Sequence, residues 1–402
     1  MDKSNKVTKL QIVKNVLNIL FGLRHYEYIW QFAFTHRRSR PLAHLTKIIM
    51  SPAILVTGGA GYVGSHTVMT LLEQEDNKHE IVVVDNLSNS YRNDGDKKPV
   101  ALQRIEEMTG RTIYFYPVDL GDSLALTKVF ENHKIECVIH FAALKAVGES
   151  VQKPLEYYQA NITGTCTLFE VMRKYNVYKL IYSSSCTVYG EPQKLPLDES
   201  HPTGQGISSP YGRTKYFCEE IMKDLCNSDQ KWQVISLRYF NPVGAHPSGR
   251  IGEDPSGIPN NLMPFISQVA VGRLSELLVF GDDYPTIDGS GVRDYIHVQD
   301  LAVGHVNAMQ LFYQKGFSGF HSVNLGTGTG YSVLQMIAAF ESVSGRKIPY
   351  KIVGRRAGDI ATNYADVSLS QELLGWRATR TVEDMCRDTW NWQSRNPSGY
   401  KS

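Results

Sequence analysis

A glycine-rich segment directly after a short apolar run constrains this chain more than any other feature. Residues 54–56 read Ile-Leu-Val, and residues 57–64 read Thr-Gly-Gly-Ala-Gly-Tyr-Val-Gly. Such glycines allow a tight turn and bring bare backbone close to a pyrophosphate at a helix N-terminus. Asp85 ends the next apolar run, 27 residues after Gly58. A carboxylate there accepts hydrogen bonds from an adenosine ribose and repels a 2′-phosphate, so the pattern predicts a dinucleotide site that favours NAD over NADP.

Apolar runs and helical patterns alternate after this segment. Continuous runs of this kind, separated by helices, are typical of a parallel sheet covered on both faces. The sequence therefore predicts an α/β fold with a Rossmann-type doubly wound sheet over residues 52–241, and a smaller α/β domain over residues 242–402. The expected strands lie at 54–56, 81–84, 137–141, 180–182 and 234–237, and the expected helices at 65–74, 155–174 and 211–225.

Composition excludes several classes of protein. Of 402 residues, 42% are hydrophobic and 20% charged, unlike disordered, collagenous or coiled-coil chains. Lys and Arg number 42 and Asp and Glu 40, but residues 1–51 hold nine of the basic and two of the acidic residues. Residues 52–402 thus carry 33 basic and 38 acidic residues, a net charge of −5, and show no basic patch of the kind that binds nucleic acid.

The chain has six scattered cysteines and no C-x-x-C pair. This pattern is typical of reduced thiols in the cytosol, not of a zinc site.

Residues 1–51 form a basic extension, for which we expect either poor order or one amphipathic helix. Apolar residues recur at helical spacing at Leu10, Val13, Val16, Leu17, Leu20 and Phe21. A basic N-terminal segment is typical of a mitochondrial targeting sequence or of a helix that binds a membrane surface. The ordinary alternative is an extension that takes no part in the chemistry. No apolar run reaches the ~18 residues of a membrane span. We expect a cytosolic protein.

Tyr211 and Lys215 lie four residues apart in a helical pattern and so share one helix face. A lysine ammonium and a nicotinamide cation beside a phenol both favour the phenolate. Bringing the tyrosine pKa from about 10 to near neutrality takes about 4 kcal/mol, which two close cations in a water-poor cleft can supply. Such a phenolate is a general base for an alcohol that loses hydride. The pair alone is a weak signal, but here it follows the glycine segment and the serine run 183–185.

These features together resemble the extended short-chain dehydrogenase/reductase family and, within it, the UDP-glucose (UDP-galactose) 4-epimerases. The resemblance covers residues 54 to about 399 and is most specific at 56–62, 140–150, 238–242, 257–264 and 291–297. It implies reversible epimerisation at C4 of UDP-galactose and UDP-glucose through a transient 4-keto sugar. It also implies a bound NAD, no metal, a homodimer formed by paired helices, and UDP-sugar binding by residues 242–402.

The resemblance also assigns residue roles. Tyr211 is the implied acid and base at the sugar 4-hydroxyl, Lys215 binds the nicotinamide ribose, and Ser185 shares the hydrogen bond to that hydroxyl. The implied cofactor-binding residues are Gly58, Gly61, Tyr62, Val63, Gly64, Asp85, Asn86, Asn89, Ser90, Asp119, Leu120, Phe141, Ala142, Lys145, Asn161, Tyr211, Lys215 and Tyr239. The implied substrate-binding residues are Lys145, Ser185, Asn241, Asn260, Asn261, Leu262, Arg293, Arg356, Asp359 and Asn363. Two arginines suit a diphosphate, because guanidinium binds oxyanions in a bidentate fork.

Two rival functions remain. A nucleotide-sugar dehydratase or decarboxylase of the same fold needs a further acid and base, and such relatives carry a carboxylate directly before Val-Tyr-Gly, where this chain has Thr187. A non-catalytic NAD-binding protein is expected to lose the Tyr, Lys and Ser set, which is intact. Two positions depart from the family pattern: Ala143 replaces the usual glycine and Cys186 the usual alanine. Cys186 is either a reactive thiol or a small buried hydrophobe.

Asn363 occupies a position where the epimerases vary in side-chain size. A bulky aromatic residue there leaves little space at the sugar C2 substituent, whereas a small residue also admits N-acetylhexosamines. Asn lacks a ring, and its amide can hydrogen-bond an acetamido group or, alternatively, nearby backbone. We expect interconversion of UDP-N-acetylglucosamine and UDP-N-acetylgalactosamine as well as of the simple hexoses.

Overall fold

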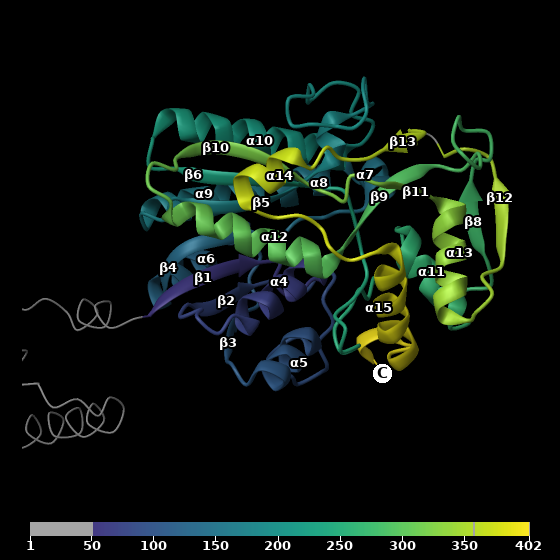
Figure 1. The fold of residues 1–402 in the computed structure, drawn as a ribbon. Coiled ribbons are helices and arrows are strands. Elements are labelled where there is room, and N and C mark those ends of the chain that lie inside the picture. The colour runs from purple at the N-terminus through teal and green to yellow at the C-terminus, as the bar shows by residue number, and fades with distance from the viewer. Residues whose placement is uncertain (1–50, 357, 402) are drawn as a thin grey trace, which may run out of the picture. The chain divides into compact units, whose positions relative to one another are not determined.

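The computed structural model describes residues 51–356 and 358–401 (Figure 1). The expectations for residues 1–50 lie outside this part of the chain. Its largest element is a seven-stranded parallel sheet with strand order β10-β6-β5-β4-β1-β2-β3. The strands are β1 (Pro52–Thr57), β2 (Glu80–Val84), β3 (Ile113–Tyr116), β4 (Lys134–His140), β5 (Lys179–Ser185), β6 (Gln233–Tyr239) and β10 (Gly319–Leu325). The strand order reverses beside β1, which is where open α/β sheets bind ligands.

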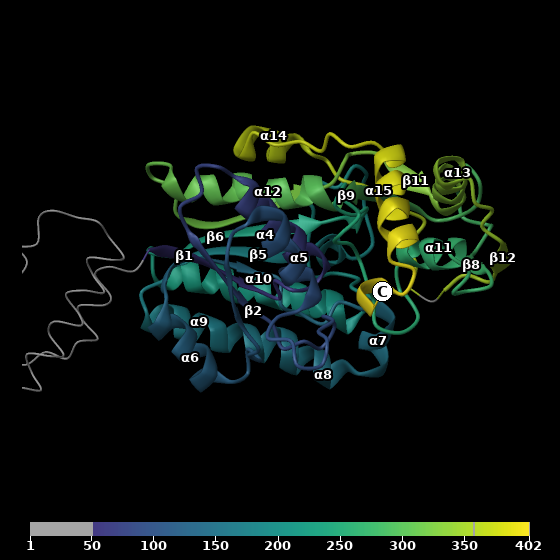
Figure 2. The same ribbon diagram turned by 90° about the horizontal axis from the view of Figure 1, so that it is seen from below.

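Helices cover both faces of this sheet (Figures 1 and 2). One face carries α4 (Tyr62–Glu73), α5 (Val100–Thr109) and α12 (Val298–Gln310), which continues into the turn η3 (Leu311–Tyr313) and packs beside α14 (Ser368–Leu374). The other face carries α6 (Ser123–Asn132), α9 (Gly164–Lys174) and α10 (Pro210–Ser228). The predicted doubly wound α/β fold is confirmed.

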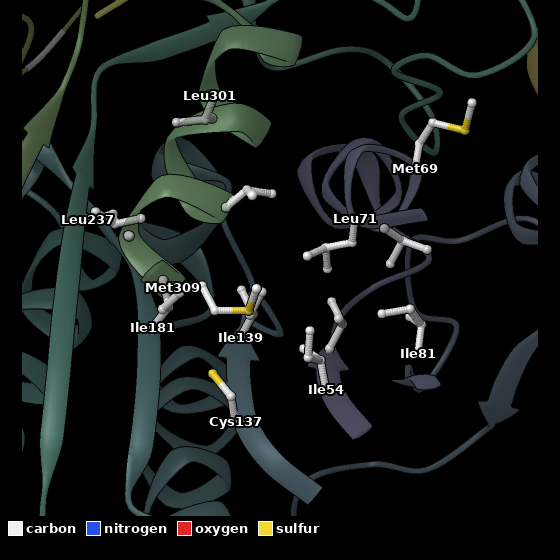
Figure 3. Close-up of a cluster of buried hydrophobic side chains, with 14 of the residues drawn as sticks. Ile54, Met69, Leu71, Ile81, Cys137, Ile139, Ile181, Leu237, Leu301 and Met309 are labelled. Carbon is white, nitrogen blue, oxygen red and sulfur yellow. The ribbon is translucent and has the colours of Figure 1, made fainter. Parts of the chain in front are cut away.

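Side chains from both faces of the central strands are buried. Ile54 of β1, Ile81 of β2 and Ile139 of β4 lie under Leu71 of α4 and Met309 of α12 (Figure 3). The alternate residues of the same strands pack against the opposite helices. Burial on two faces explains why these strands are continuous apolar runs in the sequence.

A smaller lobe is built from two short sheets and three helices. Strand β9 (Val292–His297) pairs with β7 (Asn241–Val243), β11 (Gly330–Ser332) and β13 (Thr362–Asn363), and β8 (Leu277–Phe280) pairs with β12 (Tyr350–Val353). Helices α11 (Leu262–Ala270), α13 (Val333–Ser344) and α15 (Val382–Arg395) share its apolar core, and η4 (Gly399–Lys401) follows α15. The division at residues 241 and 242 stays a prediction. The structure adds that β10, α12 and α14, all after residue 242, belong to the large sheet and its cover.

The segment predicted as one helix over 155–174 is helical but uneven. It consists of α8 (Pro154–Tyr158), the π-helical turn η1 (Gln159–Thr163) and α9, and it follows α7 (Val147–Gln152). The wider turn places Asn161 against the loop that carries Leu144. Single π-helical turns of this kind are often found at functional sites. Within residues 51–356 and 358–401, no helix has both the length and the apolar character needed to cross a membrane.

Candidate active site

A cavity of about 650 Å³ opens at the carboxyl ends of the large sheet and extends to the small lobe. Every site residue implied by the sequence lines it, with two exceptions, Asn161 and Asn363. Residues more than 200 positions apart in the chain therefore meet in one space. Among the described residues, no group of His, Cys, Asp and Glu side chains is arranged to hold a metal ion.

The glycine segment leaves its backbone open to the cavity. Gly58 has φ +66°, and a Cβ atom there would stand 2.7 Å from the backbone nitrogen of Ala142. A Cβ atom at Gly64 would collide with the carbonyl oxygen of Gly58. The first turn of α4 faces the cavity and has no acidic residue. This cradle fits the diphosphate of a dinucleotide, because unpaired N–H groups and the helix dipole favour an anion there.

Asp85 follows β2 at the edge of this cradle and is buried. Its carboxylate accepts hydrogen bonds from the backbone nitrogens of Leu87 at 2.8 Å and Ala60 at 3.2 Å. Burial raises the pKa of the Asp85 carboxyl, and these hydrogen bonds oppose the rise. The side chain therefore ties the glycine turn to the loop after β2, and its remaining lone pairs suit ribose hydroxyls.

Asn161 supports the cavity wall from behind. Its Oδ1 accepts from the Leu144 nitrogen at 2.8 Å, and its Nδ2 donates to the Leu144 oxygen at 2.9 Å and to Thr214 Oγ1 at 3.0 Å. Asn161 thus joins the loop before Lys145 to α10. Reasoning from the sequence could not distinguish this supporting position from one that lines the cavity.

Ser185 ends β5 and is held by Thr187. Ser185 Oγ accepts hydrogen bonds from the Thr187 nitrogen at 3.2 Å and from Thr187 Oγ1 at 3.0 Å, and it caps the turn η2 (Cys186–Tyr189). Because both lone pairs are used, the Ser185 hydroxyl can donate its own proton, to Tyr211 or to a ligand. Thr187 is a functional neighbour that reasoning from sequence did not identify.

Tyr211 and Lys215 project from α10 toward the same region, but Lys215 does not contact the phenol oxygen. Its Nζ donates to the Ser183 carbonyl oxygen at 2.6 Å and lies 5.9 Å from the centre of the Tyr211 ring. Burial raises the pKa of Tyr211 to about 12, although its interaction with Ser185 acts in the opposite direction. This direction is opposite to the one expected from the sequence, because the lysine is bound to β5 and burial dominates. A lowered phenol pKa requires a charge that these residues do not supply by themselves.

The small lobe contributes two arginines that share one carboxylate. Arg356 Nε donates to Asp359 Oδ2 at 3.1 Å, and Arg293 Nη2 lies 3.6 Å from Asp359 Oδ1. Two cations against one anion leave a local positive charge, as the sequence predicted for an anionic ligand. The Arg356 guanidinium also lies 5.1 Å from the centre of the Phe280 ring.

Phe280 lines the cavity and is 37% exposed, so it offers a flat aromatic face. The sequence did not reveal it, because residues 277–280 form an unbroken apolar run. Only the structure shows that Leu277 and Val279 are buried while Phe280 is exposed.

Lys145 is joined to the small lobe through Glu253. Lys145 Nζ donates to Glu253 Oε1 at 2.9 Å, and Asn261 Nδ2 lies 3.4 Å from the same oxygen. Residues implied to bind cofactor and substrate therefore share one carboxylate.

Asn363 lies behind the cavity wall. It is 6% exposed, and its Nδ2 is 3.8 Å from the sulfur of Cys186, which does line the cavity. Burial raises the pKa of the Cys186 thiol to about 12. A thiol with this pKa is inert at neutral pH, which favours the small-hydrophobe interpretation of Cys186.

The carboxylates that line the cavity lie away from Ser185 and Tyr211. Those among the described lining residues are Asp85, Asp119 and Asp359. Asp119 accepts a hydrogen bond from Asn86 near Asp85, and Asp359 lies between the arginines. The position that a dehydratase would fill with a carboxylate is Thr187, whose hydroxyl is bound to Ser185.

Comparisons with known proteins agree with this geometry. The family model for GDP-mannose 4,6 dehydratase matches residues 55–389. The UDP-glucose 4-epimerase of Drosophila melanogaster is 59% identical over 87% of this chain and 98% of its own length. The crystal structure of UDP-glucose 4-epimerase from Bifidobacterium longum in complex with NAD+ and UDP superposes with a TM-score of 0.81, at 50% identity, over 86% of this chain and 99% of that one. The structure of the UDP-Glc/GlcNAc 4-epimerase from Campylobacter jejuni gives a TM-score of 0.71, at 34% identity, over 86% of this chain and 99% of that one.

The dehydratase model describes a broad family, whereas the near full-length relatives carry the epimerase name. The match extends over the Tyr211, Lys215 and Ser185 constellation, the glycine cradle and the small lobe. This chain belongs to the extended short-chain dehydrogenase/reductase family and, within it, to the UDP-glucose 4-epimerases.

Proposed function

We propose that this chain catalyses the reversible epimerisation at C4 of UDP-galactose and UDP-glucose, with NAD as its cofactor. One observation carries the proposal: Tyr211, Lys215 and Ser185 meet in a cavity that has a glycine cradle at one end and a pair of arginines at the other. The cradle suits one diphosphate and the arginines suit a second. The reacting groups lie on α10 and β5, between these two anchors.

The cofactor is held by the glycine cradle and Asp85, with Asp119 and Leu120 beside the adenine. Bound NAD supplies the hydride acceptor and donor for C4. Lys215, fixed by the Ser183 carbonyl, presents its ammonium to the nicotinamide ribose. The same ammonium lies 5.9 Å from the centre of the Tyr211 ring.

Tyr211 accepts the proton of the sugar 4-hydroxyl and returns it after C4 is reduced on its opposite face. Ser185 donates its free hydroxyl proton to the sugar oxygen, since Thr187 occupies its lone pairs. Both groups therefore hold O4 while the charge on that oxygen changes.

The small lobe binds the UDP part of the substrate tightly, and the sugar is bound loosely enough to rotate. Arg293 and Arg356 bind the diphosphate, and Asn241, Asn260, Asn261 and Leu262 flank it. The exposed face of Phe280 offers a stacking surface for the planar base. Inversion requires this asymmetry, because the 4-keto sugar has to present both faces to the same cofactor.

The test is a coupled assay on the purified full chain with UDP-galactose. We expect UDP-glucose to form, and absorbance of reduced nicotinamide to appear transiently with a UDP-sugar. A dehydratase would instead form a product that has lost water, detectable by mass spectrometry. A non-catalytic binding protein would give neither signal with NAD bound.

Substrate range is the finer part of this proposal. The C. jejuni relative is named for both UDP-Glc and UDP-GlcNAc. Asn363 and Cys186 are smaller than an aromatic residue, so the wall beside Ser185 leaves space at C2. We include the N-acetylated UDP-hexoses among the substrates.

We also propose a cytosolic homodimer. All six cysteines are free thiols, as expected in a reducing compartment. Apolar side chains on α7, α8 and α10 are exposed: Val151 62%, Leu155 78% and Phe217 41%. These helices pack against one another, so the residues offer a surface for the same helices of a second copy. Light scattering of the full chain should give twice the chain mass, and Leu155→Asp should shift it to the monomer.

A further inference from the structure

Glu219 and Arg238 form a buried ion pair beside the catalytic residues. Glu219 Oε2 lies 2.7 Å from Arg238 Nη2, and Glu219 Oε1 lies 3.1 Å from Arg238 Nε. Their side chains are 0% and 3% exposed. The pair joins α10, which carries Tyr211 and Lys215, to strand β6 of the central sheet.

Glu219 continues the catalytic face of α10. It follows Lys215 by four residues and Tyr211 by eight, so the three side chains lie on one face of the helix. Its Oε1 also accepts hydrogen bonds from Ser184 Oγ at 2.7 Å and Ser236 Oγ at 2.9 Å. The Glu219 carboxylate therefore joins α10 to two neighbouring strands, β5 and β6.

Ser184 is the link to the reacting groups. It stands between Ser183, whose carbonyl binds Lys215, and Ser185, which lines the cavity. In the sheet, Ser184 is the register partner of Arg238, so the ion pair lies under this strand end. The Glu219 carboxylate therefore holds β5 at the residue between Ser183 and Ser185.

Stability alone does not account for this pair. Replacing a buried ion pair by well-packed apolar residues is often neutral or stabilising, so its presence is weak evidence for a structural role. The pair's placement, one helical turn from Lys215, is what suggests a part in the reaction.

We propose that Glu219 is a positioning residue for the epimerase reaction: it fixes Ser184, next to the Ser183 carbonyl that binds Lys215, and it places a carboxylate one helical turn from Lys215. The inference rests on the proposed function and adds a residue to it. Arg238 holds the carboxylate in place and is held in turn by Tyr189, whose hydroxyl lies 3.0 Å from Arg238 Nη1.

Charges and titratable groups around Lys215 support this assignment. Those facing it are Tyr211, Cys218 and Glu219 on its own helix, Tyr182 on β5 and His140 on β4. Burial lowers the pKa of Lys215 to about 8, and Cys218 and Glu219 oppose that fall. Burial also lowers the pKa of His140 to about 3, so this ring is neutral at working pH. Glu219 is the one ionised carboxylate in this group, and Arg238, Tyr182 and Tyr189 face it from β6, β5 and η2.

The test compares Glu219→Gln with Glu220→Gln in the full chain. Glu220 is the next residue of α10, but its side chain is 43% exposed and paired with Lys223. Glu219→Gln keeps an oxygen for Ser184 and loses the charge. We expect kcat to fall about tenfold or more at pH 7, with KM for UDP-galactose within about twofold. The alkaline limb of the kcat profile should move to lower pH, because Lys215 loses its proton sooner. Glu220→Gln should change none of these values.

A second variant and a direct titration distinguish loss of the Glu219 charge from a folding defect. Glu219→Gln alone leaves Arg238 without its ion-pair partner. The double variant, Glu219→Gln with Arg238→Met, removes both charges. NMR of ¹³Cε-labelled lysine, with the Lys215 signal assigned by its loss in Lys215→Arg, reports the Lys215 midpoint in each folded variant. A lower midpoint together with the shifted limb supports the proposal. An unchanged midpoint and limb, with only a lower melting temperature, would mean that the pair is structural. Absence of turnover in the wild-type chain would overturn the proposed function instead.

Discussion

The ammonium group of Lys215 is anchored to the Ser183 carbonyl oxygen, 2.6 Å away, and not to the phenol of Tyr211. The helix and the end of β5 are thereby joined through the lysine. Its Nζ lies 5.9 Å from the centre of the Tyr211 ring. The two residues therefore have separable roles, which single substitutions can distinguish.

Removing the Tyr211 hydroxyl should abolish proton transfer and leave binding intact. We expect Tyr211→Phe to lower kcat by roughly 10²- to 10⁴-fold, the usual contribution of a general acid–base group. NAD binding, measured by titration of the cofactor-free protein, should change little because the ring remains. Tyr216→Phe on the same helix is the matched control. Near-normal turnover of Tyr211→Phe would show that another group is the base.

The charge of Lys215 should set the alkaline limit of activity. The folded-state pKa of this lysine is lowered to about 8 by burial, so the ammonium form is present below that pH and is lost as pH rises through it. Turnover should therefore fall above about pH 8, since the ribose contact and the field at Tyr211 are lost together. Lys215→Ala should lower both NAD retention and kcat at every pH and remove this limb. If turnover of Lys215→Ala still falls above about pH 8, another group sets the alkaline limit.

Much of the site could be predicted because its residues have chemistry that short motifs display. The glycine turn, Asp85 and the Tyr211 and Lys215 spacing follow from local sequence, whereas the two arginines were implied by the family resemblance. Strands β1, β2, β4, β5 and β6 were predicted for a related reason: burial on two faces requires continuous apolar residues.

The two strands of the large sheet that the sequence did not predict are its edge strands, β3 and β10. Strand β3 is only four residues long, with Tyr114 40% exposed, and β10 is interrupted by the polar residues His321 and Ser322. Phe280 lies within an apolar run, so the sequence alone did not show that its side chain is exposed. The position of Asn363 behind Cys186 depends on tertiary packing, which spacing along the chain does not report.

The glycine cradle should tolerate no side chain at Gly64. A Cβ atom there would collide with the Gly58 carbonyl oxygen and open the turn. Overpacking of this kind costs about 1–3 kcal/mol, so Gly64→Ala should weaken NAD binding by roughly 10- to 100-fold. Gly354→Ala, where a Cβ atom meets nothing within 4 Å, should bind NAD as the wild-type chain does. Equal affinities for the two variants would contradict the assignment of the cradle.

Asp85 should determine the choice between NAD and NADP. Its carboxylate accepts ribose hydroxyls and repels a 2′-phosphate, and such like-charge contacts cost several kcal/mol. We expect the cofactor-free protein to bind NAD at least about 100-fold more tightly than NADP. Asp85→Asn should lower the NAD-to-NADP affinity ratio mainly by weakening NAD binding. Asp96→Asn, at a partly exposed position outside the cavity lining, should not change this ratio. Similar affinities of the wild-type chain for both dinucleotides would refute the assignment.

The cavity wall at Cys186, with Asn363 behind it, should decide which sugars fit. Asn363 fills a buried space 3.8 Å from the Cys186 sulfur, so a tyrosine ring at this position would push Cys186 toward Ser185 and the sugar. The wild-type chain should interconvert UDP-N-acetylglucosamine and UDP-N-acetylgalactosamine. Asn363→Tyr should remove this activity while UDP-galactose turnover stays within about threefold, because a bulkier wall excludes only the larger substituent.

Asn363→Ser is the matched control for this wall, since it keeps a small polar side chain and should retain both activities. The measurement is the rate with each UDP-sugar at concentrations that saturate the enzyme with UDP-galactose. If the wild-type chain turns over no N-acetylated sugar under those conditions, the dual specificity is wrong. If Asn363→Tyr loses both activities together, the residue supports the reacting groups through Cys186 and does not discriminate at C2.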